Sequence, residues 1–168
     1  MKKVVVLMLL SNQLKQLAKD YNLFIMSATQ VNANAMIEDG EFKNETSIRA
    51  SKAIVDKADV GFVMTRINDK IWNELAPQFR VAVREGILDP GILQYEEYRP
   101  THIIDIYKMR RGRYKNVRIW INLDLGTGRR KDLFMTTATN QPIGEIVDLF
   151  SSAIEQPIVY WKEELQND

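Results

Sequence analysis

Two alternating apolar runs, separated by a short basic turn, occupy the second half of the sequence. The first run reads HIIDIYKM from His102, the turn reads RRGRYKN from Arg110, and the second run reads VRIWINL from Val117. Apolar and aromatic residues at every second position on both sides of a Gly-containing turn are typical of a β-hairpin. The sequence therefore predicts an antiparallel pair of strands with a basic tip.

This predicted hairpin carries more cations than two strands need in order to fold. They are Lys108, Arg110, Arg111, Arg113, Lys115 and Arg118. Like charges opposite one another weaken a sheet unless an anion lies between them, which favours a phosphate-binding role and makes Arg111 and Arg113 candidate nucleic-acid contacts. Charged residues on a sheet edge also discourage aggregation, so an ordinary solvated edge is the alternative.

The composition of the whole chain narrows the possible functions. A net charge of +1 gives no global attraction to nucleic acid, so any attraction must come from clustered cations. The absence of cysteine excludes disulfides, zinc–thiolate sites and thiol catalysis. The opening run MKKVVVLMLL is too short to span a bilayer and is followed by no cleavage site. We therefore expect a cytoplasmic protein without a membrane partner.

The first half of the sequence predicts alternating strands and helices. Three apolar runs are typical of strands buried on both faces: Val4–Leu10, Leu23–Thr29 and Ala58–Arg66. A helix at Ser11–Asn22 would join the first two runs into a βαβ unit with a parallel sheet. Further helices are predicted at residues 47–57 and 68–86, with Pro77 bending or splitting the second.

The end of the sequence predicts one more strand and one more helix. The strand is expected at Asp132–Thr137, and Pro142 would open a helix over Ile143–Ile154 with an apolar stripe. We therefore expect a main domain over residues 1–140, followed at 141–168 by a helix and a mildly acidic tail.

Three stretches resemble DnaB-type replicative helicases. The first, LFIMSATQVN, is similar to a strand that ends in a Ser-Gln-Leu-Asn signature. In that family the glutamine senses the γ-phosphate of the nucleotide and couples it to DNA. The resemblance assigns this role to Gln30 and matches Asn32 to the asparagine of the signature, among the expected DNA contacts.

The second stretch, RASKAIVDKAD, aligns without gaps on a segment that holds single-stranded DNA phosphates in those helicases. The identical positions are Arg49, Ser51, Ile54, Ala58 and Asp59. The resemblance thus implies DNA contacts at Arg49, Ala50 and Lys52. Ala50 replaces a glutamate of the family, and Lys52 replaces a glycine, which exchanges close backbone approach for a point charge.

The third stretch is the basic hairpin, which resembles the Lys-x-Arg-x-Gly turn of the family. Lys108, Arg110 and Gly112 occupy those positions. The arginine of the family is a finger that reaches the ATP of a neighbouring subunit, assisted by the lysine. A planar, permanent cation stabilises charge on the transferred phosphoryl group, so Arg110, Lys108 and Gln30 are the expected catalytic residues.

The resemblance implies an α/β fold: part of a RecA-like P-loop NTPase core, with a largely parallel sheet flanked by helices and the antiparallel basic hairpin near its C-terminus. The sequence contains no GxxxxGK[ST] motif. We therefore expect ATP and Mg²⁺ to be bound only by a complete partner subunit, with no cofactor or metal held by this chain alone. The chain would be the C-terminal portion of a helicase motor, with single-stranded DNA and helicase subunits, or other copies of itself, as partners.

An alternative is a non-catalytic module that binds nucleic acid or a helicase and keeps the fold without the ATPase chemistry. Its phosphate contacts would come mainly from the basic hairpin, with binding that depends strongly on salt. Trp120 would either stack on a base or belong to the core. His102 has no evident partner and is expected in the core or at an edge. An unrelated enzyme is disfavoured, because no nucleophile elbow or dinucleotide fingerprint occurs.

Overall fold

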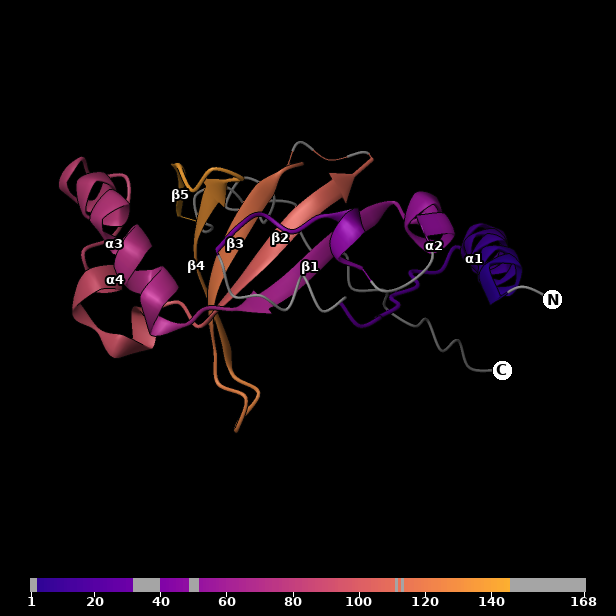
Figure 1. Cartoon of the computed structure of the whole chain (residues 1–168), viewed down its shortest axis with the longest axis horizontal. Coiled ribbons are helices and arrows are strands. Elements are labelled where there is room, and N and C mark those ends of the chain that lie inside the picture. Colours follow the sequence, from indigo (N-terminus) through magenta and orange to yellow (C-terminus); the bar gives the residue numbers. More distant parts are fainter. Residues whose placement is uncertain (1–2, 32–39, 49–51, 111, 113, 146–168) are drawn as a thin grey trace, which may run out of the picture.

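The computed structural model describes residues 3–31, 40–48, 52–110, 112 and 114–145, and its centre is one antiparallel sheet (Figure 1). The strands follow chain order: β1 (Val60–Arg66), β2 (His102–Met109), β3 (Val117–Leu123), β4 (Arg130–Thr137) and β5 (Pro142–Glu145). Every neighbouring pair is antiparallel. The expected RecA-like fold with a largely parallel sheet is therefore wrong.

The first 31 residues explain this error. Val4–Leu10 was expected as a strand, but it lies inside helix α1 (Lys3–Asp20), and Leu23–Thr29 forms no strand. A short apolar run does not by itself distinguish a strand from a helix. Here the run continues without a breaker into the helical pattern of Leu14 and Leu17. Without these two strands, the predicted βαβ unit does not exist.

The long helix α3 (Asp69–Arg84) matches the prediction more closely. Asn68 caps its N-terminus, where the side-chain Oδ1 accepts a hydrogen bond of 2.8 Å from the backbone N–H of Ile71. Pro77 lies inside the helix without splitting it. The short helices α4 (Gly91–Gln94) and η2 (Glu96–Tyr98) then lead into β2.

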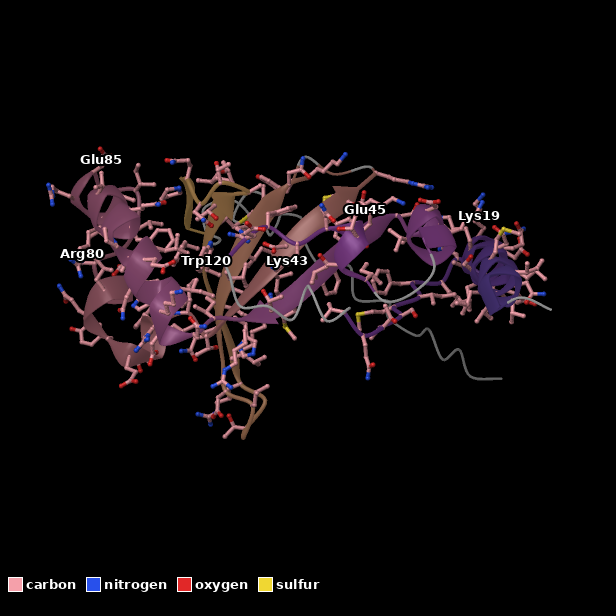
Figure 2. All side chains as sticks on the ribbon, viewed as in Figure 1. Lys19, Lys43, Glu45, Arg80, Glu85 and Trp120 are labelled. Atoms are coloured by element: carbon pink, nitrogen blue, oxygen red, sulfur yellow. The ribbon has the colours of Figure 1, made fainter. Side chains whose placement is uncertain are left out.

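The main core lies between α3 and the sheet. Phe79 of α3 is fully buried, with its ring centroid 5.1 Å from that of Trp120 on β3 and 5.0 Å from that of Phe134 on β4. Trp120 is itself fully buried, lies between the sheet and α3 in Figure 2, and donates a 2.9 Å hydrogen bond to the Thr136 hydroxyl. Trp120 is thus a core residue and offers no face to a base.

The basic hairpin and the strand expected at Asp132–Thr137 are confirmed as β2–β3 and as part of β4. The helix expected at 47–57 is shorter, because Glu45–Ser47 forms the 3₁₀ helix η1 and α2 covers only Lys52–Lys57. Residues Pro142–Glu145 pair with β4 as β5 instead of beginning a helix. The remainder of the expected helix and the tail, at 146–168, lies outside the described residues.

The strand expected at Ala58–Arg66 forms as β1, but it is not buried on both faces as predicted. It pairs with β2 alone among the strands of the described residues and is the first strand of the sheet. Its residues alternate between buried and exposed along most of its length. Helices α1 and α2 lie at one end of the molecule and α3 and α4 at the other, with the sheet between them (Figure 1). None of the described helices is long and apolar enough to cross a membrane.

Candidate functional site

Lys108 and Arg110, at the end of β2, contact the C-terminal end of α2. The Lys108 ammonium donates hydrogen bonds of 2.6 Å to the carbonyl of Val55 and 3.1 Å to that of Asp56. The Arg110 guanidinium also donates to the Asp56 carbonyl. The last carbonyls of a helix lack intrahelical partners and carry partial negative charge, so two cations stabilise this end of α2.

Asp59 connects this contact to two further elements. Its backbone carbonyl accepts a 2.9 Å hydrogen bond from the backbone N–H of Arg110, and its carboxylate lies 3.8 Å from the Arg110 guanidinium. The same carboxylate forms an ion pair with Lys15 of α1. The hairpin, α2 and α1 therefore meet at one group of charges. The Arg110 side chain keeps 48 % of its surface exposed, so it is accessible to a ligand or partner.

The surroundings of Lys108 disfavour its charged form. Burial lowers the pKa of the Lys108 ammonium, and the neighbouring Arg110 lowers it further, while the carboxylates of Asp56, Asp59 and Glu45 act in the opposite direction. An anion that approached both cations would favour the protonated form of Lys108. The pair thus places two cations side by side, and the carboxylates of Asp56, Asp59 and Glu45 offset part of their attraction for a phosphate oxygen.

The other predicted site residues do not all gather around Lys108 and Arg110. The side chain of Gln30 is exposed, and none of the hydrogen bonds of Lys108 or Arg110 within the described part of the chain goes to it. Lys52 opens α2, so the predicted DNA-binding stretch and the predicted finger adjoin one helix. Five predicted contacts lie outside the described residues: Asn32, Arg49, Ala50, Arg111 and Arg113.

Arg118, counted from the sequence among the hairpin cations, belongs to a buried polar cluster. Its guanidinium donates to both carboxylate oxygens of Asp105, at 2.8 and 3.4 Å, and to the Gly40 carbonyl and Asn140 Oδ1, at 2.7 and 2.6 Å. Asp105 also accepts a 2.7 Å hydrogen bond from the backbone N–H of Lys43, which lies beside the sheet in Figure 2. Arg118 is therefore not available to an outside phosphate.

Burial raises the pKa of the Asp105 carboxyl, while Arg118 and the Lys43 N–H oppose the rise by stabilising the carboxylate. The sequence offered one signal for this pair. Asp105 interrupts an otherwise apolar strand, and a carboxylate in such a position is normally paired. In the described residues, no group of His, Asp or Glu side chains is arranged to hold a metal ion.

A cavity of about 470 Å³ lies between the 40–42 segment, α3 and the turn after β4, and neither Lys108 nor Arg110 lines it. Its lining includes the carboxylates of Glu41 and Glu74 together with Phe42, Ile71 and Leu75. The lining holds these two carboxylates and no Lys or Arg side chain, so it repels a phosphate. This cavity therefore does not fit the anionic ligand that the hairpin cations suit.

The fold and the site thus define an antiparallel sheet with a basic hairpin that contacts the end of a short helix. Among curated proteins, the SPbeta prophage-derived uncharacterized protein YorI of Bacillus subtilis (strain 168) is 30 % identical over 141 residues. The alignment covers 82 % of this chain and 25 % of YorI, so the chain spans about a quarter of the length of that relative. No protein-family model and no solved structure matches the chain.

Proposed function

We propose that this chain is a segment of a DnaB-like replicative helicase motor that acts together with a complete subunit. In this role, Arg110 and Lys108 reach the nucleotide of that subunit, and the stretch around Lys52 contacts single-stranded DNA. Gln30 senses the γ-phosphate. The subunit that carries the P-loop supplies ATP and Mg²⁺.

The observation that carries the proposal is the contact of Lys108 and Arg110 with the last carbonyls of α2. It joins the two stretches to which the resemblance gives separate tasks, the finger and the DNA-binding segment. If either cation leaves the helix end to meet a phosphate, α2 loses a partner at its C-terminus. Nucleotide contact on one side and DNA contact on the other are then linked through one short helix.

The exposure of Arg110 supports the finger role. An arginine finger must be reachable by a neighbouring subunit and must remain charged, and a half-exposed guanidinium meets both conditions. Its ion-pair partner Asp59 is also half-exposed, so water screens that attraction and makes it weak. Moving Arg110 to a phosphate therefore gives up a weak ion pair with Asp59 and the hydrogen bond to the Asp56 carbonyl.

One observation favours a second function, that of a non-catalytic module that binds nucleic acid or a helicase. Lys108 and Arg110 already have oxygen partners within the chain, which is what a purely structural cap requires. In that case phosphate contacts come from the tip of the hairpin, and substitution of Arg113 weakens DNA binding more than substitution of Lys52.

The DNA-binding part is tested by fluorescence anisotropy of a labelled single-stranded oligonucleotide at several salt concentrations. Each phosphate neutralised in single-stranded DNA contributes roughly 0.7 to the slope of log affinity against log salt. We expect Lys52→Ala to weaken binding and to reduce this slope. Lys108→Met should also weaken binding, because it removes a donor from the end of α2.

The matched control is Lys70→Ala, which removes the same charge from the exposed first turn of α3. It should leave the affinity nearly unchanged. An equal loss in Lys70→Ala and Lys52→Ala would mean that only the overall charge matters. A loss confined to Arg113→Ala would favour the non-catalytic module, and no binding at low salt would remove DNA contact by the isolated chain.

A further inference from the structure

A second cavity, of about 330 Å³, lies between α3 and the segment that contains α4 and the start of η2. One wall comes from α3 and includes Trp72, Ala76 and Arg80. Side chains four and eight positions apart lie on one side of a helix, so α3 presents these three together. Residues 92–96 form the other wall, and Arg99 completes the lining. The volume is near the lower end of the roughly 300–1,000 Å³ typical of ligand pockets, which leaves room for one small molecule.

The lining of this cavity has an excess of positive charge. Arg80 lies at the end of the molecule formed by α3 and α4 (Figure 2); it is exposed and makes no ion pair within the part of the chain that the structure describes. Arg99 pairs with Asp69, whose side chain is 87 % exposed, so water screens that attraction and makes it weak. Glu96 is the one carboxylate of the lining. Two guanidinium groups and a single carboxylate together favour an anion.

Two aromatic rings belong to the same lining. Trp72 is buried and stacks on the fully buried Phe79, with the ring centroids 5.7 Å apart, so the core fixes this wall. Tyr95, on the other wall, is 58 % exposed, and much of its ring is accessible. Aromatic rings stack on nucleobases, and planar guanidinium groups bind phosphate through paired hydrogen bonds. A ligand that carries both a base and a phosphate therefore matches this lining.

We propose that this cavity binds one nucleotide, with the base against Tyr95 and the phosphate held by Arg80 and Arg99. Asn73 and Glu96 also line the cavity and supply polar groups for the sugar hydroxyls and the edge of the base. The site is independent of the proposed helicase role. None of its residues belongs to the cations at the end of α2, and α3 and α4 lie at the opposite end of the molecule from α2 (Figure 1).

A further ring and a further cation adjoin the cavity. The Tyr98 ring centroid lies 6.2 Å from that of Tyr95, and the Lys131 ammonium lies 3.2 Å from the Tyr98 centroid. Lys131 is the cross-strand neighbour of Asn122, whose side chain donates a 2.8 Å hydrogen bond to the Arg99 carbonyl. This arrangement suits a neighbouring nucleotide of a single strand. A free nucleotide and a nucleotide within a strand share the chemistry that the cavity recognises, so experiment must separate these two sources.

Nuclear magnetic resonance of the isotope-labelled full chain tests the site, with adenosine monophosphate as the probe from micromolar to millimolar concentration. We expect saturable chemical-shift changes at residues 72–80 and 92–99, including the indole N–H of Trp72. Adenosine alone and inorganic phosphate alone should each bind at least roughly tenfold more weakly, because each lacks one half of the ligand.

Substitutions at exposed positions of the lining separate binding from folding. Arg80→Gln removes a charged donor and Tyr95→Ala removes the stacking ring, so each should weaken binding by roughly tenfold or more. Arg84→Gln, an exposed arginine of α3 outside the lining, is the matched control and should bind like the unmodified chain. The dispersion of the amide signals in the same spectra shows whether each variant is folded.

A single-stranded trinucleotide with a terminal phosphate distinguishes the two sources. If the trinucleotide binds the same residues more tightly than the monophosphate, and Lys131→Gln removes only that gain, the nucleotide belongs to a strand. Equal affinities would identify a free nucleotide, and either result supports the site.

Three results would overturn the proposal. One is the absence of saturable shifts with both probes. Another is phosphate binding as tightly as adenosine monophosphate, or affinity that survives both Arg80→Gln and Tyr95→Ala. The third is a set of shifts confined to Lys108 and Arg110, which would place the nucleotide at the end of α2 and leave the proposed helicase role intact.

Discussion

Arg118 and Asp105 lie opposite one another on β3 and β2 and form an ion pair that is almost completely removed from water. The Nε–Oδ1 distance is 2.8 Å, and the two side chains are 1 % and 0 % exposed. Arg118 also holds the carbonyl of Gly40, and Asp105 holds the backbone of Lys43. This pair therefore fastens the 40–43 segment to the middle of the sheet.

Replacing only one member of the pair should be costly. Arg118→Met leaves a buried carboxylate without its cation, and we expect a loss of about 3–5 kcal/mol in the free energy of unfolding. Arg118→Lys should also destabilise, because an ammonium does not reproduce the fork of hydrogen bonds. Urea denaturation gives both values.

The double variant Asp105→Leu with Arg118→Met completes the cycle. It removes both charges, so it should be more stable than Arg118→Met alone. If the double variant loses as much unfolding free energy as Asp105→Leu and Arg118→Met lose together, the two residues do not interact.

Gly61 is predicted to be required by the close approach of Tyr107. A β carbon at Gly61 would lie 2.4 Å from the Tyr107 Cζ atom, and Tyr107 is itself buried. Gly61→Ala should therefore destabilise the chain by roughly 1–3 kcal/mol through overpacking. In a Tyr107→Leu background the same substitution should cost much less. Equal losses of unfolding free energy in both backgrounds would mean that the ring does not pack there.

The burial of His102 should make the free energy of unfolding depend on pH. It is 8 % exposed, and burial lowers the pKa of its imidazole below 6.5, with a further lowering from Arg66, its cross-strand neighbour on β1. The unfolded chain therefore binds a proton at a pH where the folded chain does not. This contribution to stability is present above a pH of about 6.5 and is lost as the pH falls toward the folded pKa.

The measurement is the free energy of unfolding between about pH 8 and about pH 5. His102→Gln should flatten the decline on the acidic side. An identical acidic decline in the two proteins would show that His102 does not titrate differently in the folded chain.

The hairpin, α3 and β4 follow from the sequence because their signals are local, whereas the helix expected after Pro142 begins as strand β5. The hairpin alternates polar and apolar residues around a glycine turn, and Asn68 gives α3 an evident cap. The first 31 residues were predicted wrongly because a run such as Val4–Leu10 satisfies a buried strand and an apolar helix equally. Which one forms depends on partners elsewhere in the chain.

The candidate site was predictable in part. The spacing of Lys108 and Arg110 places both at the end of β2, and their position beside α2 depends on a contact between residues more than 50 positions apart. Arg118 was misjudged because a count of cations ignores which face each one occupies. It shares the α3-facing side of β3 with Trp120, two positions later, and that parity indicates the core.

The most direct test of the central claim is ATP turnover by a complete DnaB-type helicase whose own finger arginine has been substituted. If Arg110 acts on the nucleotide of a neighbouring subunit, adding this chain should raise turnover by at least roughly tenfold, a small part of the roughly 10³–10⁵-fold that an arginine finger supplies. Arg110→Ala should give no increase, while Arg84→Ala, at the far end of α3, should act like the unmodified chain. The account is contradicted if the unmodified chain has no effect, or if Arg110→Ala stimulates equally.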